Sequence, residues 1–300
     1  MKVGFIGLGK MGGRMAERLL EKKFKVIVYA RHPASMKPLV RKGAQASSSY
    51  KDFCAKLGKN RKIFIMVTHG KAVDGVIKGL KPFLAKGDII IDGGNSFYRD
   101  SIRRGKSLAK KKVEFLDAGV SGGLQGARNG ASVMAGGSKS AFKKAEPIFR
   151  ALAVKNGYAY MGKSGAGHFV KMAHNGIEYA LLQSYGEGFQ MLEKSPFKLN
   201  LRGVAKVYRN GSVIRGWLMD LLAEALEKDV KLKRFSGKVG GGSTGTWALK
   251  TAGEMRIKAP MLEAALRARK NSAKKPDFST KVVSALRFGF GGHLEPGKKS

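Results

Sequence analysis

Residues 2–12 read KVGFIGLGKMG, and this stretch decides the fold that we predict. An apolar strand over Lys2–Ile6 runs into Gly7–Gly12, which has the spacing G-x-G-x-x-G and opens a helix near Met11–Lys22. Glycines at these positions permit a tight turn and let the backbone approach a pyrophosphate, while the helix N-terminus offers free N–H groups to the anion. Because 41 of the 300 residues are glycine, the alternative is a glycine-rich turn without a ligand. The position of the motif between a strand and a helix favours dinucleotide binding.

The same alternation of apolar strands and helical stretches continues through the first half of the chain. Further strands are expected at Lys25–Tyr29, Lys62–Val67, Asp88–Ile91, Glu114–Ala118 and Ala131–Ala135. Helices are expected between them, near residues 71–85, 98–110 and 140–152. Strands that alternate with helices are typical of a parallel sheet covered on both faces. We therefore predict a Rossmann-type, doubly wound α/β domain over residues 1–164 that binds the cofactor.

The second half of the chain shows no strand pattern. After a glycine-rich junction at Gly162–Gly167, helices are expected near residues 168–193, 201–210, 214–227, 246–258 and 260–270. From Asn271 onward the sequence is basic and contains Pro276 and Pro296, so we expect a partly extended tail. We predict that residues 165–300 form an all-helical domain for substrate binding and dimerisation, with this basic C-terminal tail.

Composition narrows the class of protein. Cys54 is the only cysteine, which excludes an internal disulfide and a cysteine-based zinc site. No apolar run reaches the ~20 residues of a membrane helix, so no membrane partner is expected. The chain begins directly with a strand, which argues against a signal peptide. These features predict a cytoplasmic protein.

The chain is strongly basic. Its 58 Lys and Arg against 21 Asp and Glu give a formal net charge of +37 at pH 7. Such a charge attracts phosphates, nucleic acid or an acidic surface in a salt-dependent way, although runs such as Lys110–Lys112 are also typical of a solvated face. No zinc finger, aromatic RNA-binding signature or isolated basic helix accompanies the charge. A nucleic-acid-binding protein on a Rossmann scaffold is therefore the alternative from another class, and we expect such binding to be at most non-specific.

The end of the second strand bears on the choice of cofactor. NAD-preferring folds usually have Asp or Glu there to bind the ribose hydroxyls. This chain has Arg31, with no acidic residue before Asp52, and a guanidinium matches a 2′-phosphate in charge and geometry. We predict NADP, although Arg31 is also one of many surface cations. The expected cofactor contacts are Gly7, Leu8, Gly9, Lys10, Met11, Gly12, Arg31, Val67 and Asn95.

A polar stripe on the first helix of the second half predicts acid/base chemistry. Positions i, i+3, i+4, i+7 and i+8 share one helix face and are occupied by Lys171, His174, Asn175, Glu178 and Tyr179. The rest of this helix is largely apolar, so we expect it to be buried on most sides, with the stripe lining a cleft between domains. Burial and neighbouring groups can move the proton affinities of a lysine and a glutamate toward neutrality. The alternative is a Lys171–Glu178 salt bridge that only stabilises the helix.

Two earlier loops suit the same cleft. Residues 92–96, Asp-Gly-Gly-Asn-Ser, follow a strand at the edge where such sheets bind ligands, and Val120–Gly123 follow the next strand. Paired glycines beside a short polar side chain expose N–H groups that can receive a carboxylate or an oxyanion. Either loop taken alone is also consistent with an ordinary turn.

Together these segments resemble the decarboxylating 6-phosphogluconate dehydrogenases, particularly their short bacterial branch. The similarity covers nearly the whole chain and is carried by GFIGLGKMGGRMA, IIIDGGNSFYRDS, FLDAGVSGGLQGARNGASVMAGG, GHFVKMAHNGIEYALLQSYGEGF and FGFGGH. The fourth segment is the most specific. The wider β-hydroxyacid dehydrogenase family shares the glycine loop, the V-S-G-G loop and the helix lysine. A member of that family acting on an unphosphorylated β-hydroxyacid is therefore the nearest alternative.

The resemblance implies oxidative decarboxylation of 6-phosphogluconate to ribulose 5-phosphate and carbon dioxide with reduction of NADP, and it implies no metal. It implies that Lys171 is the base for the C3 hydroxyl and that Glu178 protonates C1 of the resulting enediol. By the same resemblance, the hydroxyls and carboxylate of the substrate contact Asn95, Ser121, Gly122, Gly123, His174 and Asn175. The phosphate contacts Tyr179, Arg269, Arg287 and His293, the last two from a neighbouring subunit of a homodimer or homotetramer with shared active sites.

Two positions depart from the family's pattern. Thr246 stands where members often have a lysine before the tryptophan of G-T-G-K-W, and it adds no charge for the phosphate. Ala30-Arg31-His32 replaces a frequent Asn-Arg-Thr, so the adenine-side contacts are less determined than the charge match.

Overall fold

The computed structural model describes residues 1–297 and divides the chain into two compact units, Met1–Met172 and Ala173–Ser300. The division lies inside one helix, α8 (Ala166–Glu193), whereas the sequence predicts a boundary at residues 164 and 165. Residues 298–300 of the predicted second domain lie outside the described residues.

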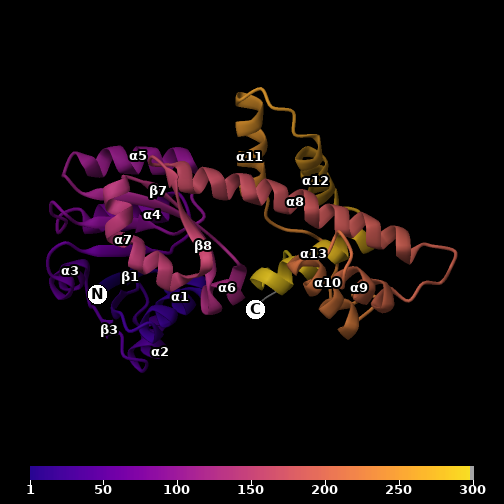
Figure 1. The fold of residues 1–300 in the computed structure, drawn as a ribbon, viewed down its shortest axis with the longest axis horizontal. Helices are drawn as coiled ribbons and strands as arrows, with labels where there is room; N and C mark the ends of the chain where they lie inside the picture. The colour runs from indigo at the N-terminus through magenta and orange to yellow at the C-terminus, as the bar shows by residue number, and fades with distance from the viewer. Residues whose placement is uncertain (298–300) are drawn as a thin grey trace. The chain divides into compact units, whose positions relative to one another are not determined.

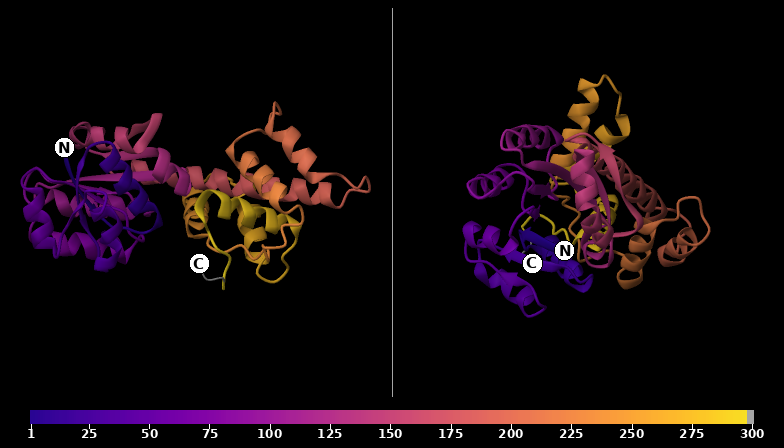
Figure 2. Two further views of the ribbon diagram at one scale, coloured as in Figure 1. Left: turned by 90° about the horizontal axis from the view of Figure 1, so that it is seen from below. Right: turned by 60° about the vertical axis from the view of Figure 1, so that its left-hand side comes forward.

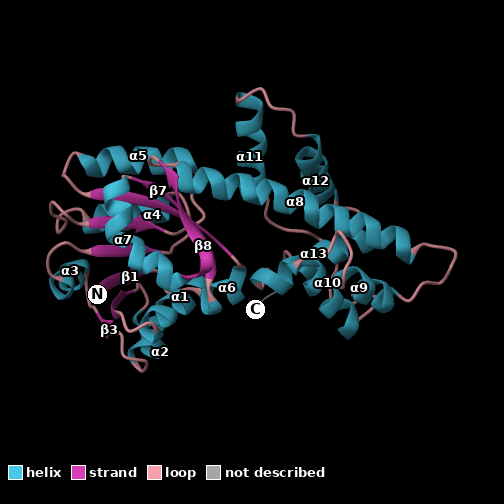
Figure 3. Ribbon diagram, viewed as in Figure 1, coloured by secondary structure: helices cyan, strands magenta, loops and turns pink. Residues whose placement is uncertain are grey.

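The first unit is built on an eight-stranded sheet with the strand order β3-β2-β1-β4-β5-β6-β7-β8. Figure 1 and Figure 3 show this sheet with helices around it. Its strands are β1 (Lys2–Ile6), β2 (Lys25–Tyr29), β3 (Gln45–Ala46), β4 (Lys62–Ile65), β5 (Ile89–Asp92), β6 (Glu114–Ser121), β7 (Ala131–Gly137) and β8 (Ala153–Gly162). Its helices are α1 (Lys10–Glu21), α2 (Lys37–Val40), α3 (Tyr50–Leu57), α4 (Lys71–Leu80), α5 (Tyr98–Ala109), α6 (Gly123–Asn129) and α7 (Lys139–Leu152).

The strands in the middle of this sheet are buried on both faces. In β1, Phe5 belongs to one apolar cluster and its neighbour Ile6 to another, because successive side chains of a strand point to opposite faces. In β5, Ile89 and Ile91 share the first cluster, while Ile90 lies in the second. Apolar burial on both faces is typical of a doubly wound sheet, and the predicted Rossmann-type fold is confirmed.

The far edge of the sheet differs from the predicted parallel arrangement. Strand β7 pairs antiparallel with β6, and β8, which the sequence pattern did not indicate, pairs parallel with β7. Strand β8 begins Ala-Val-Lys-Asn-Gly and is half exposed. It lacks the continuous apolar run of a central strand because it lies at a sheet edge, and a search for apolar runs therefore misses it.

The regular structure of the second unit, in the part of it that the structure describes, consists of helices. Two further views show its helices from different directions (Figure 2). Besides most of α8, they are α9 (Leu201–Arg209), α10 (Trp217–Lys228), α11 (Ser243–Glu254), α12 (Pro260–Asn271) and α13 (Phe278–Gly291). The core of this unit includes Leu182 and Phe189 of α8, Leu222 of α10 and Leu286 of α13. The predicted all-helical C-terminal part is confirmed.

Helix α13 corrects the expectation of a partly extended tail after Asn271. The helix starts with a reciprocal capping box between Asp277 and Thr280, which satisfies N–H groups that a helix end leaves free. Val282 and Leu286 are fully buried in the core of the second unit. Basic and proline residues on either side obscured this apolar stripe in the sequence.

The segment after α13 also folds against its own unit. The buried carboxylate of Glu295 accepts hydrogen bonds from the backbone N–H groups of Ser236 and Gly237, at 2.8 and 2.7 Å. These two hydrogen bonds fix the backbone of the segment that leads into the glycine run Gly240–Gly242 before α11.

Within the described residues, none of the helices combines the length and the apolarity that a membrane crossing requires.

Candidate active site

The glycine loop between β1 and α1 has the geometry of a diphosphate cradle. Gly7 has φ +94°, and a Cβ there would lie 2.3 Å from the Met66 carbonyl oxygen. A Cβ on Gly12 would lie 1.9 Å from the carbonyl oxygen of Gly7, so the loop closes only with glycine at both positions. Gly9, the N-cap of α1, faces open space and no side chain caps the helix. Free N–H groups facing open space fit the diphosphate of a dinucleotide.

The other predicted cofactor residues differ in how deeply they are buried. Leu8 and Met11 are partly buried against the core, so these two residues can offer a ligand mainly their backbone, whereas Lys10 is exposed. Val67 follows β4 and packs against the second apolar cluster of the sheet. Arg31 follows β2, is exposed, and forms no ion pair with any described residue.

Asn95 projects from a turn that one buried carboxylate closes. Asp92, at the end of β5, accepts the N–H of Gly94 at 3.1 Å and the hydroxyl of Ser96 at 2.8 Å. Asp92 is 0% exposed, whereas Asn95 is exposed. The Asp92 carboxylate therefore fixes the backbone of the turn that carries the exposed Asn95.

Ser121, Gly122 and Gly123 form the end of the next strand. Gly122 and Gly123 have φ values of +116° and +56°, which favour glycine over other residues. Helix α6 begins at Gly123 without a side-chain cap. This turn leaves N–H groups beside the Ser121 hydroxyl, as a site for a carboxylate requires.

Lys171 is positioned by close backbone contact between α8 and β6. The buried Asp117 of β6 accepts the N–H groups of Gly165 and His168 at 2.7 and 2.9 Å, which caps the start of α8. A Cβ on Gly119 would lie 2.4 Å from the Cβ of Lys171, so only glycine leaves room for this lysine. Lys171 is 8% exposed.

The polar stripe continues along α8 into the second unit. The ring Nδ1 of His174 lies 3.0 Å from the amide oxygen of Asn175 and 3.8 Å from a carboxylate oxygen of Glu178. Asn175 is buried and Glu178 is partly buried. His174 is thus within hydrogen-bonding distance of Asn175 and lies beside Glu178, on the face of the helix that the sequence predicts.

Two arginines meet beside Tyr179. The guanidinium carbon of Arg269 lies 3.8 Å from the centre of the Tyr179 ring. Burial lowers the pKa of Arg287 to about 10, and the positive charge of nearby Arg269 acts in the same direction, while Tyr179 and Glu178 oppose it. Neither guanidinium forms an ion pair with a carboxylate of the described residues. Two neighbouring cations, with the Glu178 carboxylate as the counter-charge near Arg287, favour the binding of a further anion.

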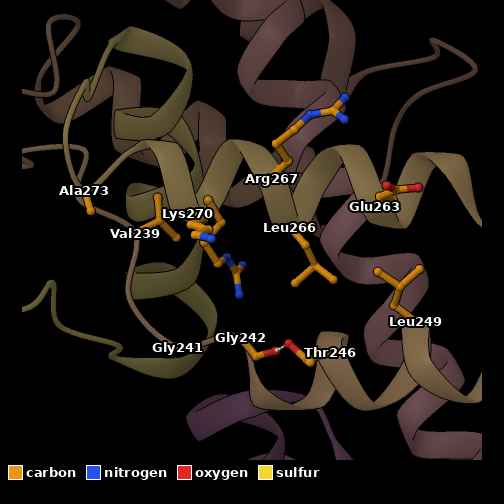
Figure 4. A pocket seen from close by; sticks show the side chains of 11 residues that line it. Val239, Gly241, Gly242, Thr246, Leu249, Glu263, Leu266, Arg267, Lys270 and Ala273 are labelled. Carbon is orange, nitrogen blue, oxygen red and sulfur yellow. Dashed lines mark hydrogen bonds between the residues drawn. The ribbon is translucent and has the colours of Figure 1, made fainter.

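A cavity of about 670 Å³ adjoins this pair of arginines. It lies between α11 and α12, where Leu249 and Leu266 stand on facing walls (Figure 4). Its lining includes Gly241, Gly242, Thr246, Arg267, Arg269 and Lys270. Gly242 is the N-cap of α11 and offers no side-chain cap to the helix start.

The sequence analysis did not name the glycine run Gly240–Gly242 among the candidate binding residues. Gly240–Gly242 directly precedes Ser243 and Thr244 at a helix start, and such a run before a helix is the signal that could have indicated it. The hydroxyl of Thr246 donates to the Gly242 carbonyl at 3.0 Å, so in this structure it is engaged by its own helix.

The structure places Arg287 with Arg269 in a single chain, whereas the resemblance implies a neighbouring subunit. The reason is that α13 is a helix packed into its own unit. His293 is exposed, and its ring lies 5.7 Å from that of Phe290.

Two family models and several known proteins match this chain over most of its length. The family model for the NAD binding domain of 6-phosphogluconate dehydrogenase matches residues 2–162, and that for the 6-phosphogluconate dehydrogenase C-terminal domain matches residues 167–287. YqeC of Bacillus subtilis (strain 168), provisionally named a 6-phosphogluconate dehydrogenase, is 43% identical over 293 residues, 98% of each chain. A Haloferax volcanii protein named 6-phosphogluconate dehydrogenase, NAD(+)-dependent, decarboxylating, is 40% identical over 295 residues, 98% of each chain.

A solved structure is similar over the full length of the chain. Plasmodium falciparum 6-phosphogluconate dehydrogenase, described in its apo form and in complexes with NADP+ and with 6-phosphogluconate, aligns with a TM-score of 0.84. The two sequences are 31% identical, and the alignment covers 100% of this chain and 67% of that one.

The paired arginines predict an effect of anions on stability. Inorganic phosphate should raise the melting temperature of the protein, and Arg269→Met or Arg287→Met should abolish that rise. Arg267→Met is the matched control, because Arg267 lines the same cavity but is exposed, and it should leave most of the phosphate effect intact. Differential scanning fluorimetry with and without phosphate measures each case.

Arg287→Met should also raise the melting temperature when phosphate is absent. The pKa of Arg287 lies at about 10, below the ordinary 12.5, so folding works against its charged form. The free-energy cost of folding with Arg287 charged is therefore present in full below pH 10. It is relieved as the pH rises above that value, because Arg287 then loses its proton in the folded protein. A lower melting temperature for Arg287→Met in phosphate-free buffer at pH 8 would contradict the argument.

Proposed function

This chain belongs to the 6-phosphogluconate dehydrogenase family, and we propose that it converts 6-phosphogluconate to ribulose 5-phosphate and carbon dioxide with NADP as the oxidant. The observation that carries the choice of substrate is the pair of guanidinium groups of Arg269 and Arg287. Both approach Tyr179, and the positive charge of each acts on the other, with the Glu178 carboxylate also near Arg287. A phosphate dianion would neutralise both charges and accept hydrogen bonds from them.

An unphosphorylated β-hydroxyacid is the nearest alternative substrate, and it makes poor use of this site. Its single carboxylate must lie at the reacting end, because it is bonded to the carbon beside the one that is oxidised. The mutual repulsion of the two arginines would then be offset only by the Glu178 carboxylate near Arg287, and no ligand charge would neutralise the pair. The charge at Arg269 and Arg287 therefore favours a substrate with a second anionic group at its other end.

We propose that Lys171 begins the reaction as a general base. Its amine accepts the proton of the C3 hydroxyl, and the C3 hydrogen leaves with its electron pair, so that a ketone forms. Bound NADP supplies the acceptor for that hydride. A base must lie within hydrogen-bonding reach of the proton that it accepts. Close packing of the Lys171 Cβ against Gly119 supports this role, because it fixes the point from which the lysine side chain extends.

Decarboxylation follows from the position of the new ketone. The bond between C1 and C2 breaks, carbon dioxide leaves, and the electron pair moves into an enolate that protonated Lys171 stabilises. Glu178 then donates a proton to the carbon that becomes C1 of ribulose 5-phosphate. His174, 3.8 Å from the Glu178 carboxylate, is placed to hold that group in position.

The remaining polar groups suit the other ends of the substrate. We propose that the N–H groups and the hydroxyl of Ser121–Gly123 receive the carboxylate that will leave. The sugar hydroxyls would contact Asn95, His174 and Asn175. Of these, Asn95 stands on the rigid turn closed by Asp92, and Asn175 is held by His174.

The family fold binds a nicotinamide dinucleotide, and we propose NADP over NAD because of Arg31. Its exposed guanidinium follows β2 and forms no ion pair with the described residues, which fits a 2′-phosphate. The relatives differ on this point: the Haloferax volcanii protein is named NAD(+)-dependent, and the Plasmodium falciparum structures include NADP+. The proposed preference for NADP over NAD therefore rests on Arg31 and not on similarity to these relatives.

We also propose that the protein assembles as a homo-oligomer through its helical unit. Large apolar side chains there are exposed, among them Ile177, Met191, Phe197 and Val207. Exposed apolar groups concentrated on one unit favour contact with another protein surface. In this proposal each chain supplies Arg287 to its own phosphate site.

The direct test of the proposed function is an assay of the purified protein with 6-phosphogluconate. NADP reduction and carbon dioxide release should occur in equal amounts, and 3-hydroxyisobutyrate should be turned over at least ~100-fold less efficiently, the scale of a lost charged contact pair. Equal or better turnover of 3-hydroxyisobutyrate would refute the choice of substrate.

Lys171→Met keeps the length of the side chain and removes its proton acceptor. Turnover should fall by at least ~100-fold, the usual scale for a general base, while the melting temperature stays nearly unchanged. Near-normal turnover in the folded variant would exclude Lys171 as the base.

Arg31→Asp removes a cation and puts a carboxylate against the 2′-phosphate. The Michaelis constant for NADP should rise by ~10-fold or more, while that for NAD changes little. Steady-state kinetics with both cofactors measure the difference. If both constants rise equally, Arg31 does not contact the 2′-phosphate.

Arg287→Ala should raise the Michaelis constant for 6-phosphogluconate by ~10-fold or more and leave that for NADP nearly unchanged. Re-annealing this variant with Lys171→Met should restore no activity, since each chain keeps one defect in its own site. Native mass spectrometry verifies that mixed oligomers form. Recovered activity in such mixtures would show that Arg287 serves the partner's site.

A further inference from the structure

Helix α5 carries a buried arginine that is tied to the turn of Asn95. Arg104 is 2% exposed, and its Nη1 donates to the Asp92 carboxylate at 3.1 Å. Its Nε donates to Asp74 at 2.8 Å and its Nη2 to the Gly70 carbonyl at 3.1 Å. All three nitrogens of the guanidinium are thus engaged, and Asp92 in turn closes the Asn95 turn. The position of this turn is therefore coupled to the position of α5.

The same helix is tied to the start of α8 through a buried serine and histidine. The hydroxyl of Ser101, 0% exposed, lies 2.7 Å from Nδ1 of His168, which is 1% exposed. The other ring nitrogen of His168, Nε2, has no hydrogen-bond partner within the described part of the chain. Burying an unsatisfied ring nitrogen costs free energy, so an apolar residue would serve better if only packing were needed.

Packing around this hydrogen bond leaves little room for adjustment. A Cβ on Gly105 would lie 2.8 Å from the Ser164 hydroxyl, and one on Gly165 would lie 2.7 Å from Ile102. The rings of Tyr98 and Phe169 meet edge to face with centroids 5.2 Å apart. The first turn of α8 therefore rests directly on α5, and the Ser101–His168 bond fixes how the two helices are aligned.

His168 lies three residues before Lys171, which is about one helical turn. We propose that Ser101 and His168 are positioning residues, which lock α5 to the first turn of α8 and so set the distance between the Lys171 amine and the Asn95 turn. This inference rests on the proposed role of Lys171 as the base. An error of about 1 Å between reacting groups can reduce a rate by ~100-fold, so such a lock affects turnover more than cofactor binding.

The test compares two serine variants at the same helix contact. Ser101→Ala removes the bond to His168, whereas Ser164→Ala removes only the bond from the Ser164 hydroxyl to the Ser101 carbonyl, which is 3.3 Å long. Ser101→Ala should lower kcat by about 10-fold with little change in the Michaelis constant for NADP. For Ser164→Ala, kcat and the Michaelis constant for NADP should each stay within about 2-fold of the values for the unaltered protein.

Histidine variants test which ring nitrogen matters. His168→Asn keeps a polar group near the position of Nδ1, whereas His168→Gln keeps one near Nε2 and loses the contact with Ser101. His168→Asn should retain kcat within about 3-fold, and His168→Gln should lose about 10-fold, at equal melting temperatures. A His168→Gln variant as active as His168→Asn would overturn the proposal, as would losses that follow the melting temperature in every variant.

A measurement without substrate separates this inference from the proposed function. The rate at which an acylating reagent modifies Lys171, followed by mass spectrometry, should rise at least about 3-fold in Ser101→Ala and His168→Gln, and stay unchanged in Ser164→Ala and His168→Asn. If the unaltered protein does not turn over 6-phosphogluconate, the proposed function fails, and these labelling rates still decide the positioning role. Equal labelling rates in all four variants would refute it.

Discussion

The rest of the structure depends on the hydrogen bonds between the Asp117 carboxylate and the first turn of α8. This carboxylate is fully buried and accepts the N–H groups of Gly165 and His168, which the helix itself leaves unsatisfied. A side chain on Gly136 or Gly167 would lie within 2.6 Å of neighbouring backbone atoms. The helix therefore meets the sheet backbone to backbone, and Lys171 starts from a defined place.

Features set by backbone geometry could be predicted from the sequence. The glycine loop after β1 requires glycine at Gly7 and Gly12, so its spacing identified both the turn and the nature of the first unit. Strand β8 and helix α13 were missed for a different reason. Their apolar residues are interrupted by exposed polar and basic ones, and only the packing of Leu286 against other helices shows that α13 belongs to a core.

The candidate site was only partly predictable from the sequence. Helical spacing placed His174, Asn175 and Glu178 on one face, and the structure confirms that they meet. No spacing rule relates Arg269 to Arg287, because they lie on different helices that tertiary packing brings together. The buried bond between Ser101 and His168 joins residues 67 positions apart and likewise follows from the fold alone.

Helix α8 runs without interruption from Ala166 to Glu193, and it therefore determines how insertions and deletions act near the site. Lys171 and Glu178 are seven residues apart, close to two full turns. One added or removed residue between them would rotate Glu178 by about 100° around the helix axis, away from the face that Lys171 shares. Surface loops of the protein can change in length at little cost, but the segment 171–178 has a required length as well as a required composition.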